Sequence, residues 1–156
     1  MKGDPKVLEV LNEALGEELT AINQYFLHSE ICENLGYSRL QQAIKAESID
    51  EMKHAEALIE RILLLEGQPN MSRYGEIRVG KEVDDMLAND LELEKGAREL
   101  YNRAIRICVE AGDMGTREVM EKILADEERH LDWLETQHSL IRQLGLVNYL
   151  ARQIHS

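Results

Sequence analysis

The chain has few of the residues that interrupt helices or favour sheets. Its 156 residues include 2 prolines, 10 glycines, one tryptophan and one phenylalanine. Sheets are enriched in aromatic and β-branched residues, whereas this chain is rich in leucine, glutamate and alanine, which favour helices. The composition predicts an all-helical protein.

Other absences narrow the class of protein. The two cysteines, Cys32 and Cys108, form no Cys-x-x-Cys pair, which disfavours a zinc knuckle or a redox pair and favours reduced thiols. The longest unbroken aliphatic run, residues 62–65, is too short to cross a membrane. The first residues also lack the apolar core of a signal peptide. We therefore expect a cytoplasmic protein that does not bind a membrane.

Positive charge is also scarce. The chain has 18 Lys and Arg against 30 Asp and Glu, a formal net charge of −12. This balance disfavours a nucleic-acid partner, which requires a basic face, and favours cations. Solvated surface carboxylates would explain the same excess.

Apolar residues recur at helical spacing along most of the chain. Asp4 and Pro5 form a typical helix start, with a capping acceptor followed by proline in the first turn. The pattern predicts a helical hairpin over residues 5–65, a crossover over 67–80, a second hairpin over 82–144 and a short helix over 146–153. Together they predict one all-α domain over 1–156, a four-helix bundle with a long crossover between helices two and three and a short C-terminal fifth helix.

The two hairpins repeat one another at an offset of 76 residues. The matched pairs are Glu18 and Glu94, Tyr25 and Tyr101, Cys32 and Cys108, Gly36 and Gly112, Asp50 and Asp126, Glu51 and Glu127, and His54 and His130. Each half therefore contains a Glu followed, 33 residues later, by Glu-x-x-His. A third Glu-x-x-His, Glu135 with His138, has no repeat mate, and we interpret it as a surface pair.

The spacing places the repeated residues at one level of the bundle. Glu18 lies 18 residues before the turn at Gly36 and Glu51 lies 15 after it, so the two come level across the hairpin. The Glu and His of a Glu-x-x-His share one helix face. Four carboxylates in a core are costly unless they are paired, and two divalent cations would balance their charge.

Carboxylate oxygens with one imidazole per metal suit iron or manganese, and this ligand set is the known pattern of ferritin-like di-iron bundles. A bundle with coincidental acid and His pairs is the alternative. The candidate metal ligands are Glu18, Glu51, His54, Glu94, Glu127 and His130.

Several motifs resemble those of the bacterioferritins, the haem-containing branch of the ferritins. They are the segments 1–4, 21–26, 51–54 and 126–130, and the similarity extends over the whole chain. The resemblance implies two iron ions per subunit. Glu18 and His54 would bind one iron, Glu94 and His130 the other, and Glu51 and Glu127 would bridge them.

The resemblance also implies that Tyr25 lies beside the di-iron centre as a candidate electron donor. Its plainer interpretation is a core tyrosine bonded to a carboxylate. We interpret its repeat mate, Tyr101, as a core residue.

Met52 is expected to point to a flank of the bundle, because it lies about 100° from Glu51 around the helix. By resemblance, Met52 is the axial ligand of haem b shared between two subunits, in a pocket lined by Leu19, Ile22, Asn23 and Phe26. An apolar dimer contact is the alternative for Met52.

The function implied by the resemblance is iron storage and detoxification in a homo-oligomer, a 24-subunit shell of twofold dimers. Fe(II) would be oxidised by O2 or H2O2 in a ferroxidase reaction, and a bacterioferritin-associated ferredoxin would be the partner that reduces the store. Relatives with an inner-surface iron site carry a His where this chain has Ala46, which puts that site in doubt.

Two other classes compete with storage. The first is a di-metal redox enzyme without storage, a rubrerythrin-like peroxidase or manganese catalase, although a rubredoxin-type Cys-x-x-Cys is missing. The second is a DNA-binding mini-ferritin, which the lack of a basic tail disfavours.

Overall fold

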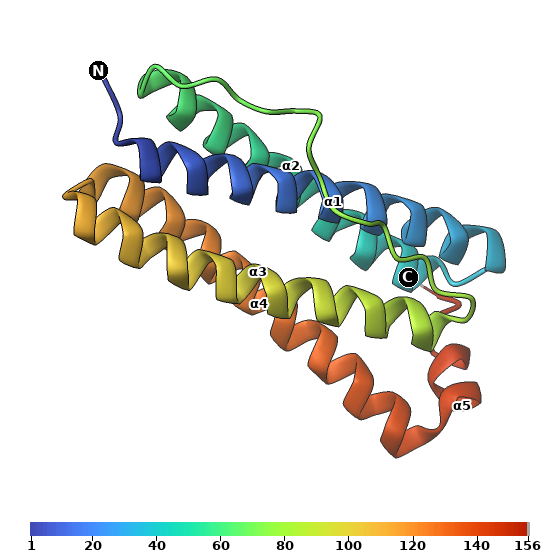
Figure 1. Cartoon of the computed structure of the whole chain (residues 1–156). Coiled ribbons are helices and arrows are strands. Elements are labelled where there is room, and N and C mark those ends of the chain that lie inside the picture. The colour runs from blue at the N-terminus through green and yellow to red at the C-terminus, as the bar shows by residue number, and fades with distance from the viewer. Residues whose placement is uncertain (156) are drawn as a thin grey trace.

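The chain folds as the predicted all-α four-helix bundle. The computed structural model describes residues 1–155, which form α1 (Pro5–Leu35), α2 (Ser38–Leu64), α3 (Val83–Ala111), α4 (Met114–Leu144) and α5 (Leu146–Ala151). α1 and α2 form one antiparallel hairpin and α3 and α4 the other, and α5 packs at the far end of the bundle (Figure 1). Over these 155 residues, no helix is both long and apolar enough to cross a membrane.

The helix ends follow local chemistry. The carboxylate of Asp4 accepts hydrogen bonds from the backbone N–H groups of Lys6 (2.8 Å) and Val7 (3.3 Å), which caps α1. The first helix of each hairpin ends at a repeat-related glycine with left-handed φ, 90° at Gly36 and 71° at Gly112. α5 ends at Ala151, two residues before the predicted end, because residues 152 and 153 form i→i+3 turn bonds instead.

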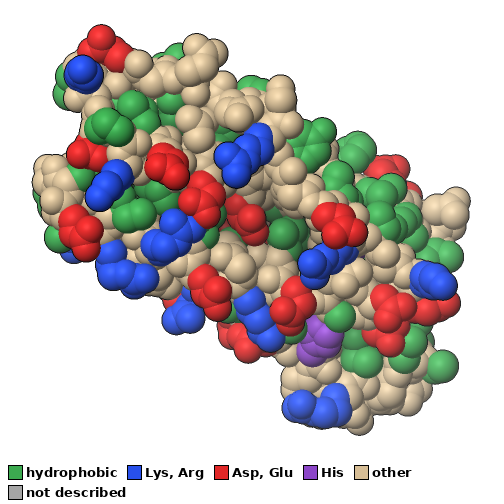
Figure 2. Space-filling model, viewed as in Figure 1, with side chains coloured by type: hydrophobic (Ala, Val, Ile, Leu, Met, Phe, Trp, Pro, Cys, Tyr) green, Lys and Arg blue, Asp and Glu red, His purple; other side chains and the backbone are tan. Residues whose placement is uncertain are grey.

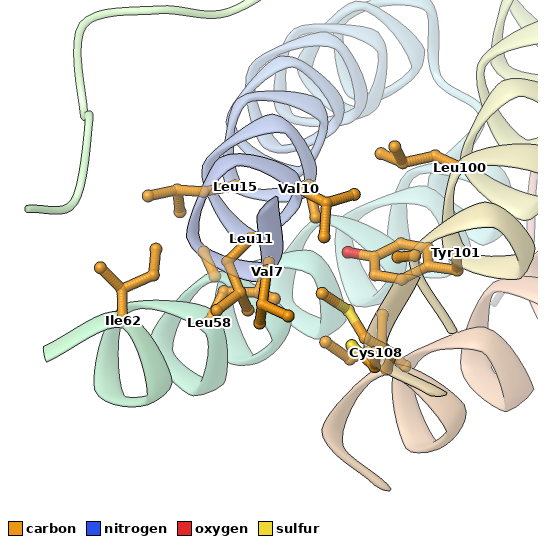
Figure 3. Close-up of a cluster of buried hydrophobic side chains, with 14 of the residues drawn as sticks. Val7, Val10, Leu11, Leu15, Leu58, Ile62, Leu100, Tyr101 and Cys108 are labelled. Atoms are coloured by element: carbon orange, nitrogen blue, oxygen red, sulfur yellow. The ribbon is translucent and has the colours of Figure 1, made fainter. Parts of the chain in front are cut away.

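Two apolar clusters fill the bundle, one toward each end. Figure 3 shows the first, in which α1, α2 and α3 contribute Val7, Val10, Leu11, Leu15, Leu58, Ile62, Leu100, Tyr101 and Cys108. The second includes Tyr25, Leu40, Ile44, Met86, Leu134 and Tyr149. The four repeat-related glutamates lie between the clusters, so apolar packing closes both ends of the level that they occupy.

The crossover between α2 and α3 has no regular secondary structure of its own over residues 67–80, yet it follows α1 closely (Figure 1). Positions four residues apart share one side of a helix. Five such positions of α1 face the crossover: Asn12, Gly16, Thr20, Gln24 and His28.

The contacts run in the same order along both segments. Asn12 Nδ2 donates to Gln68 O (3.1 Å), Gly75 N to Thr20 Oγ1 (2.7 Å), Arg78 N to Gln24 Oε1 (3.0 Å) and Gly80 N to His28 Nε2 (3.3 Å). These bonds satisfy backbone groups that lack a helix or sheet partner. They hold the crossover parallel to α1.

Gly16 allows the crossover to approach α1 closely. A Cβ at this position would lie 2.7 Å from the carbonyl oxygen of Arg73, whereas a Cβ on Gly96, in the middle of α3, would be no nearer than 3.7 Å to Glu17 Oε1. We expect Gly16→Ala to lower the free energy of unfolding by roughly 1–2 kcal/mol, because the backbone must shift. Gly96→Ala, the matched control, should raise it by up to about 1 kcal/mol through helix propensity. Urea unfolding followed by circular dichroism measures both, and equal effects of the two changes would contradict the close approach.

Candidate metal centre

The structure brings the six predicted ligand residues together in the middle of the bundle. α1 contributes Glu18, α2 Glu51 and His54, α3 Glu94, and α4 Glu127 and His130, and all six are buried. Their ligand atoms form two groups, each within 4.8 Å: Glu18, Glu51, His54 and Glu127 in one, and Glu51, Glu94, Glu127 and His130 in the other. Glu51 and Glu127 belong to both groups, which is the position that bridging ligands require.

Each histidine faces the glutamate of the opposite hairpin. His54 Nδ1 lies 2.9 Å from Glu127 Oε1, and His130 Nδ1 lies 3.1 Å from Glu51 Oε1. The remaining glutamates are slightly further away, with Glu18 Oε2 3.5 Å from His54 Nδ1 and Glu94 Oε1 3.6 Å from His130 Nδ1. The centre therefore has the approximate twofold symmetry that the sequence repeat predicts.

The outer nitrogen of each ring is held by an aspartate. His54 Nε2 bonds to Asp126 Oδ2 at 2.7 Å, and His130 Nε2 bonds to Asp50 Oδ2 at 3.1 Å. These contacts fix the rings so that Nδ1 points at the glutamates, as outer partners of metal-binding histidines commonly do. The sequence reasoning gave the two aspartates no such role, although their pairing in the repeat was the signal.

Both repeat-related tyrosines bond across the bundle. The Tyr25 hydroxyl donates to Glu94 Oε1, and the Tyr101 hydroxyl donates to Glu18 Oε1 at 2.5 Å. Tyr101 is a fully buried core residue, as its interpretation from sequence had it, but the sequence reasoning missed its bond to Glu18. Its match with Tyr25 at the repeat offset was the available signal.

The electrostatics of the centre suit cations. Within residues 1–155, one buried carboxylate oxygen of each glutamate lacks a hydrogen-bond partner: Glu18 Oε2, Glu51 Oε1, Glu94 Oε2 and Glu127 Oε2. Burial and neighbouring carboxylates raise the pKa of Glu51 and of Glu94 well above the usual value, although His130 opposes the rise at Glu94. Four carboxylates with free inward oxygens fit two divalent metal ions.

The histidines hold protons where metals would bind. Burial lowers the pKa of His54, but interactions with Glu127, Glu18 and Asp126 outweigh it and raise the pKa to about 11. At His130, burial also opposes the change, and Glu94 and Glu47 help to raise the pKa to about 10. In the metal-free protein at neutral pH both rings are therefore cationic and partly balance the carboxylates.

Two further acidic residues near the centre were not predicted. Glu47 of α2 is 7% exposed, and burial raises its pKa well above the usual value. Glu17 of α1 borders an outer groove of about 770 Å³ between α1 and α3, and burial together with Glu18, Glu94 and Glu13 raises its pKa to about 7. Figure 2 shows acidic and basic side chains mixed over this face of the molecule.

The predicted haem-pocket residues lie on a flank of the bundle, away from the buried centre. Met52 and Phe26 are 55% and 53% exposed, Asn23 is exposed, and Leu19 and Ile22 are partly buried against the core. Ser48 Oγ donates to Ile22 O at 3.0 Å, so α2 crosses α1 one turn before Met52. In an antiparallel pair that register sets Met52 beside Leu19. The flank thus offers a soft sulfur ligand among apolar side chains on the surface of one subunit.

Comparisons with known proteins define the class first. Residues 8–144 match the family model of the ferritin-like domain. Bacterioferritin from Mycobacterium leprae is 49% identical over 152 residues, which are 97% of this chain and 96% of the relative. Bacterioferritin from Streptomyces coelicolor is 49% identical over 154 residues, 99% of this chain and 92% of the relative. The chain belongs to the bacterioferritin family, as its motifs predicted.

Metal binding should expel protons from the centre. Titrating the metal-free protein with Zn(II) near neutral pH should release roughly two to four protons per chain, two from His54 and His130 and the rest from Glu51 and Glu94. Because protons and metal compete, the apparent affinity should rise from about pH 6 to about pH 8. Unbuffered pH-stat titration measures the release. His130→Gln should reduce it, whereas His138→Gln, in the unrepeated Glu-x-x-His, should not. Binding without proton release would contradict the charge state assigned here.

Proposed function

We propose that the protein stores and detoxifies iron by oxidising Fe(II) at the buried centre and holding the ferric product as mineral. The observation that carries the proposal is the set of four buried glutamates, each with an unpartnered inward oxygen, beside two histidines with Nδ1 directed at them. Its near full-length similarity to bacterioferritins supports storage. Fe(II) is the substrate, with O2 or H2O2 as the oxidant.

Each residue of the centre has a role in this reaction. Glu18 and His54 bind one Fe(II), Glu94 and His130 the other, and Glu51 and Glu127 bridge the pair. Each Fe(II) gives one electron to the oxidant and becomes Fe(III), and the carboxylates accommodate the added charge. Asp126 and Asp50 keep the imidazoles aimed inward while the metals change. Tyr25, bonded to Glu94, is the candidate source of a further electron.

The assembly and its partner belong to the same proposal. A 24-subunit shell of twofold dimers would enclose the mineral, and a bacterioferritin-associated ferredoxin would reduce it through haem b. The cytoplasmic location also stays a prediction. A di-metal peroxidase or manganese catalase without storage is the alternative, and sedimentation velocity separates a 24-mer from the small oligomer expected of such an enzyme.

Removing a ligand should abolish fast iron oxidation. We expect Glu51→Ala and His130→Ala to slow the first phase of Fe(II) oxidation by about two orders of magnitude or more, because each removes a ligand from the pair. The test is an oxygen pulse to anaerobic protein loaded with Fe(II), followed by ferric absorbance. His138→Ala is the matched control and should keep a fast phase that saturates at two Fe(II) per chain. Fast oxidation in both ligand variants would refute the proposed centre.

Met52 provides a separate test of haem binding. After reconstitution with haem b, Met52→Leu should lose the Soret spectrum of the bound haem, because leucine has no sulfur ligand. Met114→Leu, which changes a methionine that is 47% exposed at the start of α4, should bind haem like the parent. Iron oxidation should be unchanged in both variants. A full Soret band in Met52→Leu would show that Met52 is only an apolar contact.

A further inference from the structure

The repeat that makes the two iron positions alike is broken around the two tyrosines. At the offset of 76 residues, four buried polar residues in contact with or close to Tyr25 correspond to apolar ones near Tyr101. The pairs are Gln24 and Leu100, His28 and Ala104, Asp90 and Ala14, and Glu47 and Ile123, and all eight residues are buried. One tyrosine is therefore flanked by polar and charged groups and the other by hydrocarbon.

Asp90 is the centre of the polar group. Its Oδ1 accepts from Gln24 Nε2 at 2.8 Å and lies 2.8 Å from His28 Nδ1, and Asp90 itself is 1% exposed. Gly80 N donates to His28 Nε2, so the ring proton is on Nδ1 and His28 donates to Asp90. An acceptor of two N–H groups at one oxygen fits an ionised carboxylate next to a neutral histidine.

This group surrounds the contact between Tyr25 and Glu94. Gln24 and His28 lie one residue before and three after Tyr25 on α1, and Asp90 lies one turn before Glu94 on α3. Burial raises the pKa of Tyr25 well above its usual value, and Glu94, Asp90 and Glu47 add to the rise. For Tyr101, burial is again the largest cause, followed by Glu18 and Glu127, which are ligand candidates themselves. Tyr25 therefore has two extra carboxylates nearby that Tyr101 lacks.

We propose that Asp90, held by Gln24 and His28, is a positioning residue that makes Tyr25, and not Tyr101, the tyrosine that is oxidised during iron oxidation. The inference rests on the proposed ferroxidase function. Losing an electron makes the surroundings of a tyrosine more positive by one unit. In a buried site with a low effective dielectric constant, a fixed negative charge nearby favours that loss. Apolar neighbours such as Ala14 and Ala104 give Tyr101 no such help.

The electrons and protons balance with the reactants already named. Reduction of O2 to two waters takes four electrons and four protons. Two electrons come from the bound Fe(II) pair, one from Tyr25 and one from a further Fe(II). The phenolic proton of Tyr25 moves along its bond to Glu94, which leaves a neutral tyrosyl radical. Another Fe(II) then reduces the radical, and the proton returns from Glu94.

Freeze-quench electron paramagnetic resonance after an oxygen pulse to the Fe(II)-loaded protein detects this radical. The signal should vanish in Tyr25→Phe and persist in Tyr101→Phe. Asp90→Asn keeps the acceptor oxygen for Gln24 and His28 but removes the charge, and it should lower the radical yield about tenfold. The fast phase of Fe(II) oxidation in the same samples should change by less than about twofold, because Asp90 is not a ligand. Glu99→Gln removes an exposed charge from the same helix and should leave the radical unchanged.

The outcomes separate a charge effect from packing and from failure of the proposed function. Asp90→Leu removes both charge and acceptor. If Asp90→Leu loses the radical while Asp90→Asn keeps it, Asp90 acts through packing and the inference is wrong. A radical on Tyr101, or no radical while fast oxidation persists, would also overturn it and leave the ferroxidase proposal intact. Loss of the fast phase in the parent protein would instead refute the ferroxidase function, and the inference with it.

Discussion

Four carboxylates share one level of a core from which water is excluded, and this constraint organises the rest of the structure. Burial and mutual repulsion both oppose their ionised forms. Without metal, the protein meets the cost with protons, on the imidazoles of His54 and His130 and on Glu51 and Glu94. A pair of divalent cations can replace those protons at the same oxygens. The centre is therefore built for exchange between protons and metal ions.

Packing around the centre keeps the carboxylates in place despite that cost. Apolar clusters close the bundle on both sides of the glutamates, so their side chains cannot reach solvent without opening the core. Hydrogen bonds from Tyr25 and Tyr101 join the two hairpins at the same level. The tyrosines therefore act as crosslinks between α1 and α3 as well as neighbours of the metal positions.

The sequence predicted the bundle and the six clustered residues because both depend on spacing. Apolar periodicity sets the helices, and equal distances from Gly36 and Gly112 bring Glu18 level with Glu51 and Glu94 level with Glu127. Contacts between the hairpins were harder to predict, because they depend on how two helices face each other. The bonds from Asp50 to His130 and from Tyr101 to Glu18 cross this boundary. The order in which the crossover follows α1 likewise depends on three-dimensional approach and has no periodic signal.

The broken symmetry follows from topology. The bundle has two matching hairpins, but a crossover links them only once, and it lies against α1 (Figure 1). Its backbone N–H groups need acceptors, and Gln24 and His28 supply them to Arg78 and Gly80. At the matching positions of α3, Leu100 and Ala104 face no second crossover and pack as hydrocarbon. The amide and imidazole that hold the crossover then use their remaining N–H groups to bind Asp90. A structural need of the connection thus places a buried charge beside only one of the two tyrosines.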